Sequence, residues 1–145
     1  MPTVLVTEDS MFLRIANQRI LTRAGYDVIT ATDGPEALQM ARDQHPDLVL
    51  LDMMLPRLSG QSVLQKLKAD PGTAAIPVVI LSSLSQVNAE KLRAAGAAAF
   101  LEKGQILDNP RPLLQAIESA LRKASERKTA AKPANPQLRP QLEQL

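Results

Sequence analysis

Residues 48–52 read Leu-Val-Leu-Leu-Asp, an uninterrupted run of aliphatic side chains that ends on a carboxylate. Such a run does not alternate between apolar and polar residues, so it predicts a strand that is buried on both faces. Shorter apolar runs of the same kind occur at residues 4–6, 28–29, 77–81 and 98–101. The sequence therefore predicts five short strands in one buried sheet.

Segments with helical spacing separate these runs. In residues 11–24 the apolar positions recur every three or four residues, and Gly25 follows as a helix stop. The predicted inner face of this helix carries Leu13, Ala16, Ile20 and Ala24. Further helices are predicted to begin near Asp33-Gly34-Pro35, Ser59, residue 86 and Pro110.

Strands that alternate with helices are joined by right-handed crossovers, which make neighbouring strands parallel. We therefore expect the α/β class, with a doubly wound five-stranded parallel sheet and helices on both faces. The usual strand order for five such units is the flavodoxin-like order 2-1-3-4-5.

The composition excludes several classes of function. With 145 residues, the chain is long enough for one domain with a full core and not comfortably long enough for two. It has no cysteine and one histidine, which excludes disulfide scaffolds, thiolate-bound zinc and multi-histidine metal sites. No apolar stretch reaches the roughly 18 residues of a membrane span, and no secretory signal is present. We therefore expect a cytoplasmic protein without a membrane partner.

Charge is unevenly distributed along the chain. Residues 1–121 contain 11 basic and 13 acidic residues, whereas residues 122–145 contain 6 basic and 2 acidic residues. After about Ala124 the apolar periodicity also stops, and prolines follow. We predict one domain over residues 1–124 and a basic, proline-containing, flexible tail or linker over residues 125–145. Aromatic residues are too few for base stacking, so nucleic acid is not expected as a partner.

Polar residues follow the predicted strands at their carboxyl ends, the edge at which open α/β sheets bind ligands. Glu8 and Asp9 follow the first strand, and Asp52 ends the third. Ser82 ends the fourth strand, and Lys103 follows the fifth. Each residue alone has an ordinary structural explanation, such as a helix start, a turn or a surface charge. Their common placement instead predicts one pocket.

Three carboxylates in one small pocket repel one another unless a cation or a proton neutralises them. With no histidine or cysteine at hand, the ligands are oxygens, and Mg²⁺ suits such a set. The nearby amine and hydroxyl would then complete a site for a phosphoryl group. A carboxylate that faces an in-line phosphoryl donor can act as the nucleophile.

Other chemistries fit less well. The chain has no GxxxxGK[ST] loop and no GxGxxG after the first strand. Thr7-Glu8-Asp9 would repel the phosphate of a flavin mononucleotide, and phosphatases of the haloacid dehalogenase type want an aspartate where this chain has Met54. A Ser/His/Asp triad would need His45, which precedes the third strand at the opposite edge of the sheet.

Four segments together resemble the receiver domain of two-component response regulators, the CheY-like family. They are VLVTEDS at residues 4–10, LLDMMLP at 50–56 with Gly60, ILSS at 80–83 and FLEK at 100–103. The resemblance covers roughly residues 3–122. It implies a phosphorylation-dependent signalling switch rather than an enzyme.

The resemblance also implies roles for the pocket residues. Asp52 would accept the phosphoryl group from a histidine kinase or a phosphotransfer protein, and Lys103 would pair with the phosphoryl oxygens. Mg²⁺ would be held by Glu8, Asp9, Asp52 and the backbone carbonyl of Met54.

The same resemblance implies a switch. Ser82 would turn inward to bond the phosphorylated aspartate, and Phe100 would swing inward with it. The surface formed by the fourth helix, the fifth strand and the fifth helix would change and bind a downstream protein.

The chain departs from the family at several positions. Gly104 stands where the family usually has proline in a cis peptide, and a Lys-Gly bond should be trans. The resemblance therefore does not predict the path of the loop that carries Lys103. Phe100 lacks the hydroxyl of the commoner tyrosine. Met54 and Leu84 are apolar where they flank the phosphorylation site, and they would obstruct the hydrolytic water, so we predict a long-lived aspartyl phosphate.

Two alternatives remain on the sequence alone. The chain could be a phosphate-independent interaction adaptor that keeps the fold, or the receiver fragment of a longer regulator. The acidic residues argue against the adaptor, because a purely structural domain has little reason to keep carboxylates that repel one another.

Overall fold

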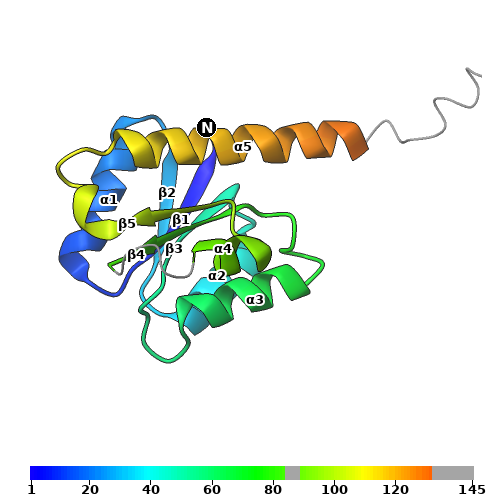
Figure 1. The fold of residues 1–145 in the computed structure, drawn as a ribbon, viewed down its shortest axis with the longest axis horizontal. Coiled ribbons are helices and arrows are strands. Elements are labelled where there is room, and N and C mark those ends of the chain that lie inside the picture. The colour runs from blue at the N-terminus through cyan, green and yellow to red at the C-terminus, as the bar shows by residue number, and fades with distance from the viewer. Residues whose placement is uncertain (84–88, 132–145) are drawn as a thin grey trace, which may run out of the picture.

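The computed structural model describes residues 1–83 and 89–131 of the chain (Figure 1). The prediction for Leu84, the predicted helix start at residue 86 and residues 132–145 of the predicted tail lie outside this range. The elements alternate along the chain as β1 (Thr3–Thr7), α1 (Met11–Arg23), β2 (Asp27–Ala31), α2 (Gly34–Gln44), β3 (Leu48–Asp52), α3 (Gly60–Ala69), β4 (Val78–Ser82), α4 (Ala89–Ala94), β5 (Ala99–Glu102), the 3₁₀ turn η2 (Lys103–Gln105) and α5 (Arg111–Ala131).

The five strands form one sheet in the order β2-β1-β3-β4-β5, and every neighbouring pair is parallel. The predicted class and strand order are therefore confirmed. β3 lies at the centre and is buried along its whole length, as its aliphatic run predicts. The order reverses between β1 and β3, so the carboxyl ends of these two strands flank the crevice of the sheet.

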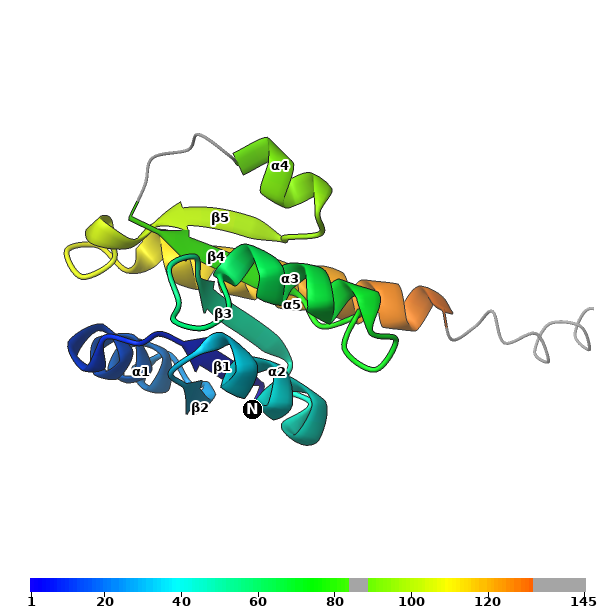
Figure 2. The same cartoon turned by 90° about the horizontal axis from the view of Figure 1, so that it is seen from below.

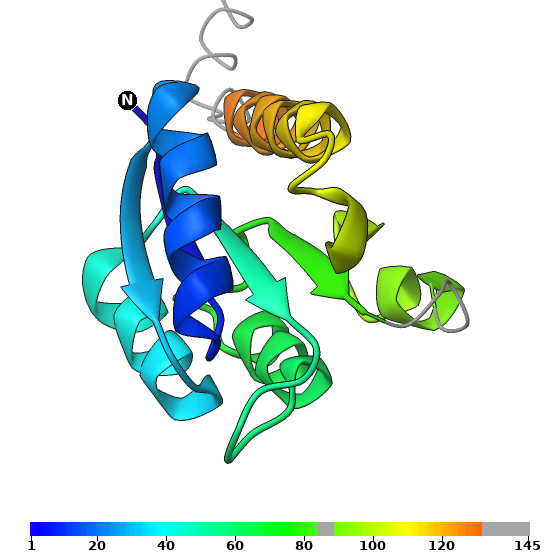
Figure 3. The same cartoon turned by 90° about the vertical axis from the view of Figure 1, so that its left-hand side faces the viewer.

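Helices cover both faces of the sheet, as Figure 3 shows along the layers and Figure 2 from below. The helices α1 and α5 pack on one face, and α2, α3 and α4 pack on the other. Each face has its own apolar cluster, because successive residues of a strand point to opposite sides. In β3, for example, Val49 and Leu51 belong to one cluster, and Leu48 and Leu50 belong to the other.

Three helices begin at residues whose side chains cap them. The side chains of Ser10, Asp33 and Ser59 accept hydrogen bonds from the backbone N–H groups of Leu13, Glu36 and Ser62, respectively. Ser10 fixes the start of α1 directly after Glu8 and Asp9, and this places the first turn of the helix beside the predicted pocket.

The buried stripe of α1 agrees in part with the predicted one, since Leu13, Ala16 and Ile20 are partly buried and Ile20 packs against the apolar cluster. Asn17 and Leu21 are the fully buried residues of the helix, whereas Ala24 is its exposed C-cap. The prediction followed the apolar residues, but a buried asparagine cannot be recognised from a hydrophobic pattern. Gly25 does end the helix, with a φ of 99° that favours glycine.

The last helix is longer than the apolar pattern suggests. α5 continues to Ala131, past Ala124, where the apolar periodicity stops. Residues 123–131 are rich in alanine, lysine, arginine and glutamate, which sustain a helix by intrinsic propensity. The loss of apolar periodicity at residue 124 therefore does not mark the end of the helix. The division of the chain into a domain and a tail at that point stays a prediction.

The edge strand β5 is only partly buried, unlike β3 and β4. Its outer edge has no neighbouring strand in the described sheet, so its backbone is less covered. Within residues 1–83 and 89–131, no helix has the length and apolar character that crossing a bilayer requires.

Candidate functional site

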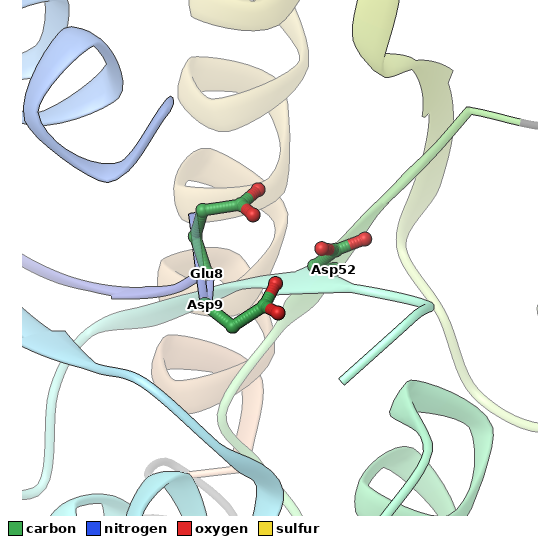
Figure 4. Close-up of side chains that lie close together, drawn as sticks. All are labelled: Glu8, Asp9 and Asp52. Atoms are coloured by element: carbon green, nitrogen blue, oxygen red, sulfur yellow. The ribbon is translucent and has the colours of Figure 1, made fainter. Parts of the chain in front are cut away.

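Three carboxylates meet at the carboxyl ends of β1 and β3. Glu8 and Asp9 follow β1, and Asp52 is the last residue of β3. One carboxylate oxygen from each of the three lies within 4.8 Å of the others. Figure 4 shows the side chains of Glu8 and Asp9 extending from adjacent residues toward the side on which Asp52 lies. The structure thus brings together the acidic residues that the sequence placed at one edge.

Two of these carboxylates are buried and one is open to solvent. Glu8 and Asp52 are each 1% exposed, whereas Asp9 is exposed. Burial raises the pKa of Glu8 above its usual 4.5, and the charge of Asp52 adds to this effect. A hydrogen bond from the backbone N–H of Ser10 opposes the rise without cancelling it.

Lys103 links the two buried carboxylates. Its Nζ lies 2.8 Å from Asp52 Oδ2 and 3.1 Å from Glu8 Oε1. Burial alone would lower the pKa of Lys103, but hydrogen bonds to Asp52 and Glu8 outweigh it and leave the pKa raised. The ammonium therefore stays charged at neutral pH and offsets part of the carboxylate repulsion.

The loop after β5 brings Lys103 to the pocket without a cis peptide. No cis bond occurs among the described residues, so the Lys103–Gly104 bond is trans, as predicted for a Lys-Gly bond. The short distance from Lys103 to Asp52 shows that glycine at position 104 does not prevent this contact.

Each oxygen of Asp52 has its own hydrogen-bond donor. Oδ2 accepts from Lys103, and Oδ1 accepts from the backbone N–H of Met54 at 3.2 Å. Met54 is thus part of the pocket through its backbone, while its side chain is 65% exposed. The predicted use of its carbonyl as a metal ligand stays a prediction.

Ser82 and Phe100 lie where the sequence placed them along the strands. Ser82 ends β4 and is 2% exposed. Phe100 lies in β5, is partly buried, and packs against the apolar cluster under α2, α3 and α4. Their inward movement on phosphorylation stays a prediction.

His45 lies away from the acidic pocket. It ends α2 and lines a cavity of about 610 Å³ with Met1, Asp47 and Pro77, at the amino ends of the strands. The interpretation that excluded a Ser/His/Asp triad is consistent with this position.

The residues fit a hard divalent cation. Every side-chain ligand on offer is a carboxylate oxygen, which is the donor that Mg²⁺ prefers. Glu8 Oε1 is buried and receives no hydrogen bond, although the charge of Lys103 lies close to it. A buried carboxylate oxygen without a donor is the kind of atom that a cation would satisfy.

The comparison with known proteins agrees with this geometry. The sequence profile of the family described as "Response regulator receiver domain" matches residues 4–126. The chain belongs to this family. Receiver domains of response regulators are the phosphorylation-dependent signalling switches of two-component systems, and this function class applies to the chain.

Relatives of this receiver domain include short and long regulators. It is 34% identical over 134 residues to the "DNA-binding dual master transcriptional regulator RpaA" of Synechocystis, and the match covers 91% of the chain and 54% of the relative. It is 33% identical over 102 residues to the "Polar-differentiation response regulator DivK" of Brucella ovis, with 70% and 83% covered. It spans only 34% of the "Probable transcriptional regulator ycf27" of Porphyridium aerugineum.

Solved structures share the fold of this receiver domain. The signal receiver domain of a putative Luxo repressor protein from Vibrio parahaemolyticus superposes with a TM-score of 0.80 at 29% identity, covering 89% of this chain and 96% of that one. A CheY-like receiver domain protein from Methanospirillum hungatei gives 0.77 at 25% identity, with 88% and 98% covered.

Sequence reasoning missed the role of two residues that shape the pocket of this receiver domain. Arg14 donates to the backbone carbonyls of Glu8 and Asp9, and no sequence pattern points to this contact. Gly60 lies against the backbone of Asp52 and Met53. The resemblance names Gly60 only as part of a motif and does not indicate this close backbone contact.

Glu8→Gln is expected to stabilise the metal-free protein at pH 7. Because burial raises the pKa of Glu8, its ionisation opposes folding as the pH rises above 4.5, and glutamine removes that penalty. We expect the midpoint of thermal unfolding without metal to rise by about 3 °C. Added Mg²⁺ should raise the midpoint of the wild type more than that of the variant. A drop in the metal-free midpoint, with exposed Glu90→Gln neutral, would contradict the expectation.

Proposed function

We propose that Asp52 accepts a phosphoryl group and that its phosphorylation is the signal this chain carries. The observation that supports this most directly is the position of Lys103, with Nζ 2.8 Å from Asp52 Oδ2 in a pocket of three carboxylates. A buried carboxylate beside an ammonium can approach an anionic phosphoryl donor, because the positive charge offsets the repulsion.

The transfer needs one nucleophile and several positive groups. A carboxylate oxygen of Asp52 bonds to phosphorus while the bond from phosphorus to the donor's nitrogen or oxygen breaks and the leaving group departs. Lys103 would follow the charge from the carboxylate to the phosphoryl oxygens. The N–H of Met54 would remain as a fixed donor at the other side of Asp52.

We propose Mg²⁺ as the cation, held by Glu8, Asp9, Asp52 and the backbone carbonyl of Met54. When bound, it would supply positive charge to both the acidic pocket and the phosphoryl oxygens. The exposure of Asp9 leaves a side of the pocket open through which a hydrated ion can enter.

The output of the switch would pass through protein contacts. Ser82 would bond the phosphorylated aspartate, Phe100 would move inward, and the surface of α4, β5 and α5 would bind a downstream target. The phosphoryl donor would be a histidine kinase or a phosphotransfer protein. The chain would act in the cytoplasm as a signalling protein and not as an enzyme.

A phosphate-independent adaptor is not favoured. It would have no use for three clustered carboxylates, whose repulsion costs folding free energy. The relatives include regulators of which the chain covers about half or less, so the domain we propose over residues 1–124 could serve alone or as the receiver of a longer protein.

Incubation with acetyl phosphate tests the proposed function. We expect one phosphoryl group per chain by intact mass when Mg²⁺ is present and none when the metal is chelated. An adaptor would stay unlabelled under both conditions, and this result would exclude the switch.

We further predict that the phosphoryl group on Asp52 is lost slowly. Met54 carries an exposed apolar side chain two residues after Asp52, where it would hinder the water that attacks phosphorus. Met54→Asn should shorten the lifetime of the isolated phosphoprotein severalfold, because an amide can orient that water. Rapid loss of label from the wild type on addition of Mg²⁺ would refute the prediction.

A further inference from the structure

Arg14 reaches back from α1 to the turn that carries two of the carboxylates. Its side chain is partly buried, and Nη1 lies 3.1 Å from the carbonyl oxygen of Glu8 and 3.4 Å from that of Asp9. One guanidinium nitrogen therefore lies between two successive carbonyl groups. The contact joins the second turn of the helix to the backbone of the pocket.

The conformation of this turn decides where the two carboxylates point. Glu8 and Asp9 are adjacent in sequence, so their side chains would normally leave the backbone in different directions. Here one oxygen from each lies within 4.8 Å of the other and of Asp52. The mutual repulsion of these groups favours any backbone change that separates them. The turn must therefore be held against that repulsion.

The backbone of the turn has two further anchors. Glu8 N–H donates to the carbonyl of Ala31 at 3.1 Å, and Ser10 N–H donates to Glu8 Oε2 at 3.1 Å. Arg14 adds contacts to the carbonyl oxygens of Glu8 and Asp9, in the peptide groups that link residues 8–9 and 9–10. It is also a charge-assisted donor, which is the stronger kind of hydrogen bond.

We propose that Arg14 is a positioning residue for the divalent cation: it holds the Glu8–Asp9 turn in the conformation in which both carboxylates converge on Asp52. The proposal rests on the proposed function and deepens it. Arg14 would touch neither the cation nor the phosphoryl group, and it would act only through the backbone to which it donates.

The charge of Arg14 has the opposite effect on the same site. A guanidinium close to a cation pocket repels the incoming ion, so removing the charge alone would tighten Mg²⁺ binding. Loss of the turn contact should weaken Mg²⁺ binding, whereas loss of the charge should strengthen it. This difference makes the proposal testable by affinity.

Calorimetric titration with MgCl₂ separates the two effects. Arg14→Met removes both donor and charge, and we expect Mg²⁺ affinity to fall about tenfold, as for other residues that orient metal ligands. Arg14→Gln keeps an N–H donor without the charge and should recover part of the loss. The exposed Arg19→Met on the same helix is the control for losing one positive charge, and it should bind Mg²⁺ at least as tightly as the wild type.

Amide hydrogen exchange tests whether Arg14 holds the Glu8–Asp9 turn. In the metal-free protein, the amide hydrogens of residues 8–10 should exchange faster in Arg14→Met than in Arg19→Met, while the unfolding midpoints of the two variants stay similar. Tighter Mg²⁺ binding by both Arg14 variants would overturn the proposal, as would unchanged exchange in the turn. A wild type that binds no Mg²⁺ would instead remove the proposed function itself, so the two failures are distinguishable.

Discussion

Asp52→Asn is expected to abolish all metal-dependent labelling by acetyl phosphate. The amide of asparagine has the shape of the carboxylate but lacks the charge and the nucleophilic oxygen that attack phosphorus. Asp52 is buried and contacts both Lys103 and the N–H of Met54, so no other carboxylate can take its place in the same geometry. The measurement is intact mass after incubation with acetyl phosphate and Mg²⁺, and the loss should be complete.

The matched control is Asp43→Asn, which makes the same chemical change on the exposed side of α2. It should be labelled like the wild type. Label that persists on Asp52→Asn would place the acceptor elsewhere and remove the assignment. A folded but unlabelled Asp52→Asn, shown by an unchanged circular dichroism spectrum, separates loss of the acceptor from loss of the fold.

Of the substitutions that we propose, Gly60→Ala is expected to lower the free energy of unfolding the most. A Cβ at position 60 would overlap the carbonyl oxygen of Asp52 and lie 2.7 Å from Cα of Met53, closer than side chains pack. Both obstacles are backbone atoms, so neither can rotate away. We expect the free energy of unfolding to fall by about 3 kcal/mol and labelling to slow, because the displaced strand end carries Asp52, the acceptor that we propose. Urea unfolding and the initial labelling rate measure the two effects.

Gly104→Ala is the control for this prediction. A Cβ there would meet nothing within 4 Å, so the change should alter stability by at most about 0.5 kcal/mol. Lys103 should keep its contact with Asp52, and labelling should continue at the rate of the wild type. Equal effects of alanine at positions 60 and 104 would show that crowding at the end of β3 is not the cause.

The sheet could be predicted because a strand that is buried on both faces appears in the sequence as an uninterrupted run of aliphatic residues. The run at residues 48–52 has no polar interruption until Asp52, and the structure buries all of it. The helix starts at Asp33 and Ser59 were equally visible, since capping depends on one side chain and the next few backbone groups. The pocket followed because parallel strands present their carboxyl ends at one edge.

What escaped prediction depends on contacts between residues that no local pattern connects. The inner face of α1 includes the polar Asn17, so hydrophobic periodicity found the correct side of the helix through Ile20 but not the residue buried beside it. The contact of Arg14 with two carbonyl groups depends on how α1 leaves its cap. The length of α5 was underestimated because propensity alone extends it after the apolar stripe ends.

The ion pairs of Lys103 join residues that are far apart in the sequence, so the ribosome adds Lys103 well after the two carboxylates. Lys103 lies 51 residues after Asp52 and 95 residues after Glu8 in the sequence. During synthesis, a chain that has completed β3 holds its carboxylates but not the ammonium that balances them. If Asp52 is the acceptor that we propose, its pocket is complete only once β5 has docked, and labelling by acetyl phosphate would also report that the sheet has assembled.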